Sequence, residues 1–454
     1  MRLLLTKWKK LTTGSPNRQI LSAAITVGLM TVLVKVAAAG KELVVAWRFG
    51  TGDALDAFLI ALLVPSFITN VVAGSFNAAL IPTYIRVREQ EGVKTAQKLL
   101  SGVTVWSLGL LLITTTLMVI TAPLYLRSIA TGFSPEKLNL TFRLLCTLSP
   151  VVLLDGMIVI WGAVLNAGER FVLAALSPTV TPVITVIFLL IDKSIGVFAL
   201  AGGLVCGSLL EMLILGAALK RQGISVRPRW YGFDAHLRQV ADQYAPMIAG
   251  AFLMCSTSLV DQSMAAMLSP GSVAALNYGT KVIALPISLI STALSTAVIP
   301  YFSKMVACSD WVGVRGTLKR YLWLIFITTV PITGFFFLFS QPIVELLLQR
   351  GSFTPQDTHV VAQIQTMYAL QIPFYVGAIL VVRLISSIRF NHILMWVSAF
   401  NLIINTTLNY IFMQYFGIKG IALSTSCVYI FGFFYVLYFL QKRLKQIELE
   451  LDKS

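Results

Sequence analysis

Residues 55–81, LDAFLIALLVPSFITNVVAGSFNAALI, decide the class of fold. They hold one ionisable side chain, Asp56, and form a block longer than the roughly 20 apolar residues that cross a bilayer as a helix. Over all 454 residues, 57% are apolar and 12% are charged, and the mean hydropathy is +0.82. Water-soluble domains carry about 25% charged residues. The composition therefore excludes an ordinary soluble enzyme and predicts an all-α polytopic membrane protein.

Similar apolar blocks recur along the chain and predict twelve transmembrane helices. We expect them at residues 19–39, 55–81, 99–122, 141–165, 171–191, 195–217, 244–268, 272–300, 320–342, 360–385, 391–413 and 418–441. Lys and Arg favour cytoplasmic segments; 24 of the 35 lie in the termini and even-numbered loops, against 7 in odd-numbered loops. Both termini are therefore expected in the cytoplasm. The net charge of +16 reflects this topology, so we expect no nucleic-acid partner.

The two halves of the sequence resemble each other at a nearly constant offset. The matched pairs, 219–221 residues apart, are Pro65 with Pro286, Pro123 with Pro342, Pro135 with Pro355, Phe171 with Phe390, and Gly196 with Gly417. Each copy carries six predicted spans, an even number, so both copies enter the membrane from the same side as a parallel repeat. We predict two six-helix lobes, residues 1–218 and 244–454, joined by a cytoplasmic linker at 219–243. A cavity between such lobes is typical of an alternating-access transporter.

Several ionisable side chains lie inside or beside the predicted spans. A charge at the centre of a membrane helix costs about 2.5–3.5 kcal/mol or more, and it usually faces a cavity or a partner. Cations in the early helices of both lobes suit a phosphate group, which Lys binds as a point charge. The alternative for Lys35, Lys281 and Arg383 is that they reach to the membrane surface. The predicted substrate-binding residues are Lys35, Lys41, Lys281, Asp56 and Arg383.

Four stretches of the sequence carry a resemblance to a known family. They are KELVVAWRFGTGDALDAFLIALLVPSFITNVVAGSFNAALIPTY (41–84), VLNAGERFVLAALSPTVTPVI (164–184), LNYGTKVIALPISLISTALSTAVIPYFSK (276–304) and LLLQRGSFTPQDT (346–358). The chain resembles the MurJ (MviN) lipid II flippases of the multidrug/oligosaccharidyl-lipid/polysaccharide exporter superfamily over nearly all of residues 20–441. The resemblance implies two lobes of helices around a cavity. It also implies transfer of undecaprenyl-pyrophosphate-linked sugars to the outer leaflet, without ATP hydrolysis by the chain.

The sequence departs from this family in its cations. The cavity arginines of the family match Lys35, Lys41 and Lys281, which keep the charge but lose the bidentate guanidinium fork. The arginine pair usual in the second helix falls near Thr69 and Asn70, so that contact is expected to be absent. These differences leave two substrates open, lipid II and another polyprenyl-pyrophosphate-linked glycan such as an exopolysaccharide or O-antigen unit.

A single acid lies in the middle of the seventh predicted span. Asp261 needs a proton, a cationic side chain or a bound ion, because an unpaired carboxylate is costly there. Some members of the resembled family bind sodium between the seventh, eleventh and twelfth helices. We therefore predict a cation site formed by Asp261, Asn401, Asn405 and Thr425. The alternative is a protonated Asp261, or one that is hydrogen-bonded to polar neighbours within its lobe.

The predicted function is a flippase for a polyprenyl-pyrophosphate-linked saccharide in the bacterial cytoplasmic membrane. We expect a monomer that is not an enzyme, whose partners are this glycan and membrane lipids, with no cofactor besides Na⁺ or H⁺ as coupling ion. A drug/cation antiporter of the same superfamily, the first alternative, would favour acidic cavity groups. A membrane glycosyltransferase or polymerase, the second, would need a catalytic set in a large loop. The longest predicted loop, about 218–243, offers only Asp234, His236 and Asp242.

Overall fold

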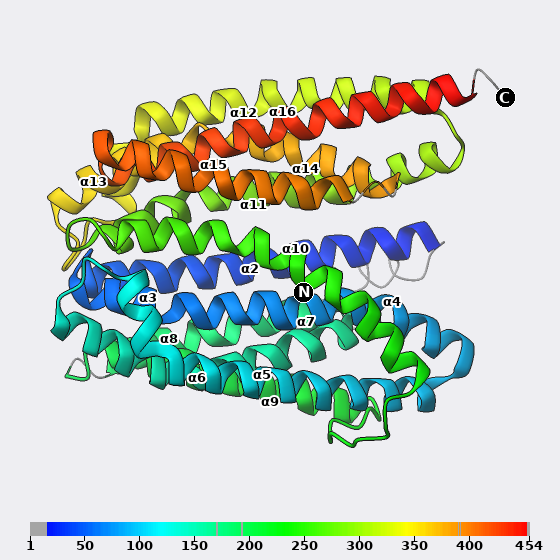
Figure 1. Ribbon diagram of the computed structural model, residues 1–454, viewed down its shortest axis with the longest axis horizontal. Coiled ribbons are helices and arrows are strands. Elements are labelled where there is room, and N and C mark those ends of the chain that lie inside the picture. Colours follow the sequence, from blue (N-terminus) through cyan, green and yellow to red (C-terminus); the bar gives the residue numbers. More distant parts are fainter. Residues whose placement is uncertain (1–15, 169–170, 192–193, 389, 391, 452–454) are drawn as a thin grey trace, which may run out of the picture. The chain divides into compact units, whose positions relative to one another are not determined.

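The computed structural model describes residues 16–168, 171–191, 194–388, 390 and 392–451, and every regular element in these ranges is helical (Figure 1). The helices are α2 (Pro16–Phe49), α3 (Asp53–Ile68), a π-helical turn (Thr69–Ala73), α4 (Gly74–Glu91), α5 (Val93–Ile129), α6 (Pro135–Ala167), α7 (Phe171–Leu176), a 3₁₀ turn (Ser177–Thr179), α8 (Val180–Ile191), α9 (Val197–Arg221), α10 (Ala235–Ala265), α11 (Ser272–Ala307), α12 (Trp311–Leu348), α13 (Pro355–Ala369), α14 (Ile372–Ser387), α15 (His392–Phe416) and α16 (Ile418–Leu451). The predicted all-α membrane fold is confirmed.

Helices occupy the positions of all twelve predicted spans. Among the described residues, eight helices are long and apolar enough to cross a membrane, and α13 with α14, bent by 42°, would make a ninth. The remaining predicted spans correspond to α2, α11 and α15. Asparagines at 401, 405 and 409 lower the apolar character of α15. The count of twelve stays a prediction.

The predicted linker between the lobes contains the end of α9 and the start of α10. We predicted it at residues 219–243, but α9 continues to Arg221 and α10 begins at Ala235. Asp234 explains the early start of α10, because its carboxylate accepts a hydrogen bond from the backbone N–H of Leu237 at 2.8 Å. A side chain that satisfies a free N–H in this way stabilises the first turn of a helix.

The helices form two compact units. Unit 1 comprises Met1–Val45, Val64–Ala122 and Phe142–Ala251, and unit 2 comprises Ala46–Leu63, Pro123–Thr141 and Phe252–Ser454. Two short segments of the N-terminal half, 46–63 and 123–141, thus pack with the C-terminal half in unit 2. The division into lobes at 1–218 and 244–454 remains a prediction from the sequence repeat.

The internal repeat is visible in the backbone of both halves. Gly196 and Gly417, one just before α9 and one just before α16, each have a φ of 60°. Gly50 and Gly271, before α3 and α11, have φ angles of 54° and 86°. Glycine adopts such left-handed angles without the steric cost that other residues meet. Both pairs are 221 residues apart, within the offsets found in the sequence.

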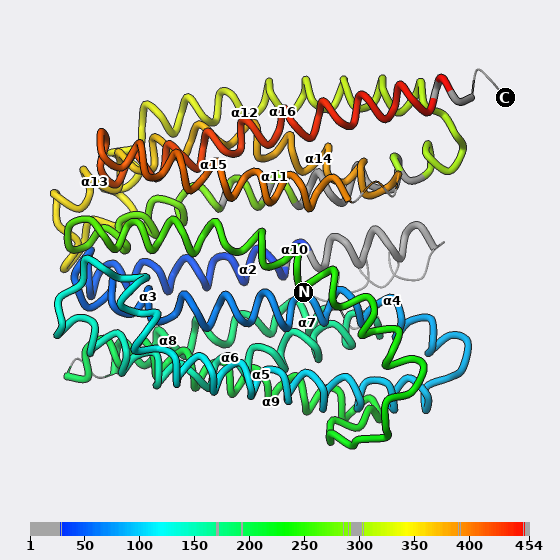
Figure 2. Tube along the Cα trace, in the orientation of Figure 1, coloured from blue at the N-terminus to red at the C-terminus, as the bar shows by residue number. Residues whose placement is uncertain are grey.

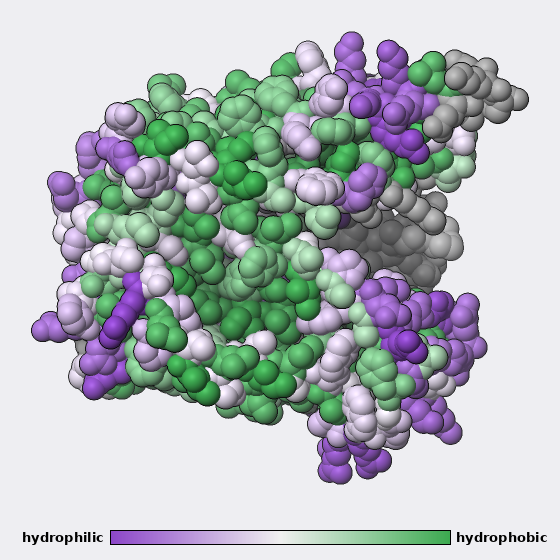
Figure 3. Space-filling view, in the orientation of Figure 1, coloured by the Kyte–Doolittle hydropathy of each residue, from purple (hydrophilic) through white to green (hydrophobic). Residues whose placement is uncertain are grey.

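Each unit has its own apolar core, and Figure 3 shows apolar side chains over much of the helix surface, with hydrophilic ones gathered toward helix ends. In unit 1, the ring of Phe76 stacks on Tyr244 at a centroid distance of 4.0 Å and meets Trp106 edge to face at 5.0 Å. In unit 2, Phe302 and Phe433 are buried among aliphatic side chains of α12, α14 and α16. These cores hold the polar residues described below in fixed positions.

Gly207 on α9 allows the close packing of α8 against α9 in unit 1. A methyl group added at Gly207 would lie 2.7 Å from the Cα of Thr181, whereas one added at Gly202 would lie 3.6 Å from the nearest ring atom of Phe188. We expect Gly207→Ala to destabilise the protein by about 1–3 kcal/mol, as overpacking does. Gly202→Ala is the matched control and should be neutral or slightly stabilising, since alanine favours a helix. Thermal unfolding in detergent measures both, and equal midpoints would contradict this packing.

Candidate functional site

The predicted cations of unit 1 lie on α2. Lys35 is exposed, and Lys41 is half-buried with its Nζ 2.9 Å from Oε1 of Glu42. Ion pairs between partly exposed side chains contribute about 1 kcal/mol or less. The binding of a phosphate by Lys41 stays a prediction.

The predicted cations of unit 2 lie on α11 and α14, two helices that pack against each other. Lys281 of α11 and Arg383 of α14 are both exposed. Binding of these residues to one substrate stays a prediction.

The second predicted span is interrupted where the family resemblance places its missing arginine pair. Thr69–Ala73 form a π-helical turn between α3 and α4. Such turns are rare and often occur at functional sites. Asn70 is exposed within the turn. In α4, four residues after the π-helical turn ends, the Oδ1 atom of Asn77 is buried without a hydrogen-bond partner among the described residues. This segment thus offers amide groups where the family has guanidinium groups. Asn77 was not among the residues predicted from the sequence.

The predicted site residue Asp56 belongs to a polar group in unit 2, which we call the Asp56 cluster: Asp53, Asp56, Lys137, Gly271 and Ala274. The Asp56 side chain is 1% exposed, and its Oδ2 atom lies 3.0 Å from Nζ of Lys137. Lys137 also pairs with Asp53, which is 60% exposed. The buried ion pair connects the start of α3 to the start of α6.

The carboxylate of Asp56 also caps α11. It accepts hydrogen bonds from the backbone N–H groups of Gly271 at 2.7 Å and Ala274 at 2.8 Å. Gly271 is the N-cap residue of α11 and has no side chain to satisfy the free N–H groups of the first turn. A negative charge at a helix N-terminus is also favoured by the helix dipole. Asp56 supplies from α3 the cap that α11 lacks. Its predicted contact with substrate stays a prediction.

Further contacts join the same end of unit 2. The hydroxyl of Thr51 donates to Asp357, which also forms a capping box with Thr354 at the start of α13. The backbone N–H of Ser352 donates to the carbonyl of Trp47 at 2.8 Å. All of these residues, and the Asp56 cluster, lie in or next to loops with odd numbers in the predicted topology. They therefore gather at the end of unit 2 predicted to face away from the cytoplasm.

The predicted cation site is assembled in unit 2 from α10, α15 and α16, the last two of which run side by side (Figure 2). Asp261 is 8% exposed and accepts hydrogen bonds from Nδ2 of Asn405 at 3.0 Å and of Asn409 at 2.6 Å. The hydroxyl of Thr425 donates to its other oxygen at 3.2 Å. We call these four residues the Asp261 cluster.

Of the residues predicted for the cation site, Asn401 does not contact Asp261, whereas Asn409, which was not predicted, does. Asn401 packs against Gly432, and its Oδ1 atom is buried without a hydrogen-bond partner in the described structure. Asn409 contacts Asp261 instead. The signal was present in the sequence, since Asn401, Asn405 and Asn409 recur every four residues along one helix face. The sequence did not reveal which two of the three lie level with Asp261.

The Asp261 cluster has the donor chemistry of a site for one monovalent cation. Its potential ligands are all oxygens, from one carboxylate, two amides and one hydroxyl, and hard cations prefer oxygen ligands. A single carboxylate balances a single positive charge. The Oδ1 atom of Asn409 is buried and has no hydrogen-bond partner within the described ranges, so turning this amide would direct one more oxygen toward Asp261. The described residues contain no group of three His, Cys, Asp or Glu side chains that could hold a metal ion.

Unit 1 contains two further acids within predicted spans. Glu211 of α9 is 4% exposed and accepts a hydrogen bond from the Thr181 hydroxyl at 2.8 Å. Asp155 of α6 is half-buried. Glu211 has a neutral hydroxyl partner, whereas Asp261 is surrounded by three donors. Glu211 is therefore a useful reference residue for experiments on the Asp261 cluster.

Comparison with known sequences identifies the family. The profile of the family described as lipid II flippase MurJ matches residues 45–453. A probable lipid II flippase MurJ of Synechocystis sp. is 25% identical over 450 residues, covering 96% of this chain and 84% of that protein. One from Buchnera aphidicola subsp. Acyrthosiphon pisum is also 25% identical, covering 90% of this chain and 81% of that protein.

Comparison with solved structures shows the fold. A lipid II flippase MurJ in an inward closed conformation matches with a TM-score of 0.79 at 23% identity, covering 94% of this chain and 90% of that one. An inward-facing multidrug transporter of the MATE family matches with a TM-score of 0.76 at 13% identity, covering 94% and 99% of the two chains. The chain shares the helical fold of this transporter superfamily.

Proposed function

The chain belongs to the lipid II flippase MurJ family, and from this membership we propose that it moves lipid II from the inner to the outer leaflet of the bacterial cytoplasmic membrane. The family match over residues 45–453 carries the proposal. Relatives named as lipid II flippases that align over more than four fifths of their length support it. The chain is a multi-pass membrane transporter and not an enzyme.

Growth of bacteria depleted of their own lipid II flippase tests this function. Cells that express the chain are expected to keep dividing, because lipid II again reaches the outer leaflet. Lysis in spite of normal membrane insertion would contradict the proposal. Recovery only of a strain that lacks a flippase for polysaccharide units would assign another polyprenyl-pyrophosphate-linked glycan as substrate.

In the proposed mechanism, the predicted cations Lys35, Lys41, Lys281 and Arg383 bind the pyrophosphate. A pyrophosphate carries several negative charges, and its transfer across a bilayer requires cations that replace its water shell. Lysine ammonium groups bind phosphate as point charges without a fixed fork geometry. The same lysines can therefore keep contact with the phosphates while the helices that carry them move.

The Asp56 cluster acts as the gate toward the outside in this mechanism. Alternating access requires that one end of the transporter is closed while the other is open. Asp56 ties the start of α3 to the start of α11, and Lys137 ties it to α6. Release of lipid II to the outer leaflet requires these contacts to separate. Solvation of Asp56 and Lys137 on opening offsets the loss of their ion pair, which makes the gate reversible.

In this mechanism, Asp261, Asn405, Asn409 and Thr425 would hold a sodium ion. When bound, sodium supplies the positive charge that a buried carboxylate needs in a membrane lobe. Asp261 joins α10 to α15 through Asn405 and Asn409 and to α16 through Thr425, so a bound ion would couple the packing of these helices to the sodium gradient. A proton on Asp261 is the alternative coupling ion.

Sodium is expected to raise the thermal unfolding midpoint of the purified protein in a saturable way, whereas potassium at equal ionic strength is not. At a hundred times its dissociation constant, an ion that binds only the folded state stabilises it by about 2.7 kcal/mol. Asp261→Asn should lose the effect, because the charge that attracts the ion is gone. Glu211→Gln, which removes a buried carboxylate from unit 1, should keep it. Equal midpoints in both salts would exclude the sodium site.

The proposed orientation places both termini in the cytoplasm. Single cysteines at Ser194 and Ser269 are then expected to react in intact cells with a thiol reagent that does not cross membranes. Cysteines at Thr95 and Gly223 should react only after the cells are opened. A background without the five native cysteines gives the baseline. The reverse labelling pattern would overturn the orientation.

A further inference from the structure

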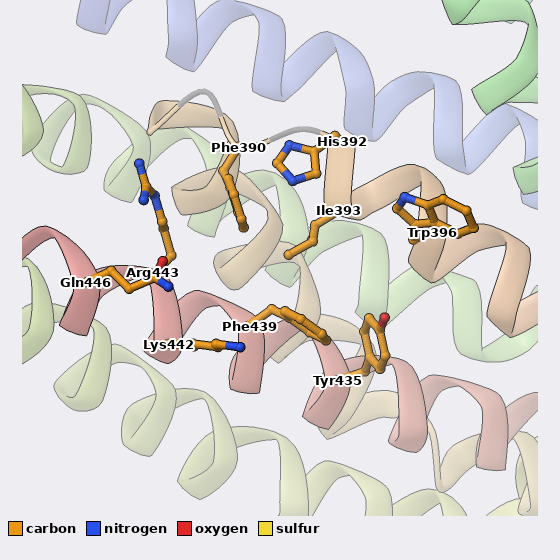
Figure 4. Close-up of a pocket in the computed structure, with 9 residues that line it drawn as sticks. All are labelled: Phe390, His392, Ile393, Trp396, Tyr435, Phe439, Lys442, Arg443 and Gln446. Atoms are coloured by element: carbon orange, nitrogen blue, oxygen red, sulfur yellow. The ribbon is translucent and has the colours of Figure 1, made fainter.

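An open cavity of about 360 Å³ lies in unit 2 between the start of α15 and the last turns of α16 (Figure 4). None of the residues assigned above to substrate, gate or sodium is among the described residues that line it. The cavity is lined by Phe390, His392, Ile393, Trp396, Tyr435, Phe439, Lys442, Arg443 and Gln446. We call it the α15–α16 pocket.

The α15–α16 pocket has a cationic end and an aromatic end. Figure 4 shows Lys442 and Arg443 toward one end and Trp396 with Tyr435 at the other, with Phe439 between them. Residues three and four positions apart share one face of a helix, so α16 presents its aromatic and cationic residues in a single row. The pocket is therefore suited to a ligand whose charged group continues into an apolar chain.

Aromatic contacts hold the pocket open in a defined shape. The ring of Tyr435 lies 4.7 Å from that of Phe439 and stacks on Phe400 at 5.6 Å. The guanidinium of Arg443 lies over the ring of Phe390 at 5.6 Å, which fixes the guanidinium near the cationic end. A preformed pocket binds its ligand with a smaller loss of side-chain freedom.

The charge of the pocket selects for an anion. Lys442 and Arg443 are cationic, His392 adds an imidazole, and no Asp or Glu is among the described residues that line it. The pocket lies at the end of unit 2 that carries the tenth loop and the C-terminal tail, both predicted to be cytoplasmic. Basic pockets between helices on the cytoplasmic side are suited to phosphate head groups of anionic lipids. Trp396 is 62% exposed beside the pocket, as is typical of aromatic residues at a membrane surface.

We propose that the α15–α16 pocket binds the phosphate of an anionic membrane lipid. Lys442 and Arg443 contact the phosphate, and Trp396, Tyr435 and Phe439 pack against the first methylene groups of the chain. A volume of about 360 Å³ accommodates a head group but not an oligosaccharide. The ligand is either a phospholipid such as phosphatidylglycerol or a polyprenyl phosphate, which share this phosphate-and-chain chemistry. The proposal does not depend on the identity of the transported substrate.

Native mass spectrometry of the detergent-purified protein tests this site with phosphatidylglycerol, polyprenyl monophosphate and phosphatidylcholine as probes. The wild-type chain is expected to retain one anionic lipid and to release phosphatidylcholine readily. The double variant Lys442→Gln/Arg443→Gln should retain it roughly thirtyfold less well, since each basic residue contributes about fivefold. The control Lys94→Gln/Lys98→Gln removes the same charge from the exposed surface of α5 and should bind as the wild type does.

Two further variants separate lipid binding from folding. Lys442→Arg/Arg443→Lys keeps both charges and should retain the lipid, while Trp396→Ala should weaken retention although the charge is unchanged. When phosphatidylglycerol and polyprenyl monophosphate are added together, the one that is retained more strongly is the natural ligand of the pocket. Equal retention by the wild type and Lys442→Gln/Arg443→Gln would overturn the proposal. So would an equal loss in the Lys94→Gln/Lys98→Gln control.

Discussion

Lys281→Ala is expected to abolish transport of lipid II while the protein still folds and inserts. The side chain is exposed on α11, so its removal leaves no cavity in the core. Loss of one partner from a desolvated charge pair costs about 2–5 kcal/mol. Since 1.4 kcal/mol corresponds to a tenfold change, the affinity for the pyrophosphate should fall roughly thirtyfold or more. Lys281→Arg keeps the charge and should retain part of the activity.

The matched control for Lys281→Ala is Lys304→Ala, which removes an exposed lysine near the other end of α11. It should transport lipid II as the wild type does. The same comparison can be made in unit 1, where Lys41→Ala is expected to stop transport and Lys98→Ala is not. Full transport by a normally inserted Lys281→Ala variant would exclude its proposed role.

Asp56→Ala is expected to open the end of unit 2 that faces outward. The substitution removes the cap of α11 and leaves Lys137, which is 10% exposed, with Asp53 as its one ionic partner among the described residues. Removal of one partner of a buried ion pair costs about 3–5 kcal/mol. At the lower value, the gate equilibrium shifts roughly hundredfold. A cysteine placed at Ala274, which is fully buried, should then react with an external thiol reagent about a hundred times faster.

Asp53→Asn is the control for this gate variant. Asp53 contacts the same lysine but is 60% exposed, and exposed ion pairs contribute about 1 kcal/mol or less. In Asp53→Asn, the rate at which the cysteine at Ala274 reacts with the external reagent should rise less than roughly fivefold. Asp56→Asn keeps an acceptor for the N–H groups of α11. Its labelling rate should therefore lie between those of Asp53→Asn and Asp56→Ala. Unchanged labelling in Asp56→Ala would show that the cluster does not hold this end closed.

The sequence predicted the fold well, because membrane helices depend on long apolar blocks that composition reveals directly. The internal repeat was also recognisable from the sequence. Gly196 and Gly417 occupy matching positions in the two halves, and both have a left-handed φ that glycine tolerates best. The helix α10 begins before the predicted span at 244–268, and its polar first turns depend on a cap from Asp234. Apolar blocks alone do not reveal such caps.

The candidate sites were predicted less completely than the fold. Asp261 was identified because an acid within a membrane span needs a partner, but the choice between Asn401 and Asn409 depends on how α15 is rotated and shifted against α10. Asp56 was predicted as a substrate ligand, and its contacts with Gly271 and Ala274 could not be foreseen. Those contacts join backbone atoms more than two hundred residues away in sequence, and no side-chain pattern marks them.

Exposure of lipid II at the outer surface of living cells tests the central claim most directly. In cells depleted of their own flippase, an externally added enzyme that cleaves lipid II measures how much substrate has crossed the membrane. The chain is expected to restore cleavage, and the triple variant Lys35→Ala/Lys41→Ala/Lys281→Ala, inserted at the same level, is expected to give none. Absence of cleavage with the wild-type chain, or equal cleavage with the triple variant, would contradict transport of lipid II by these cations.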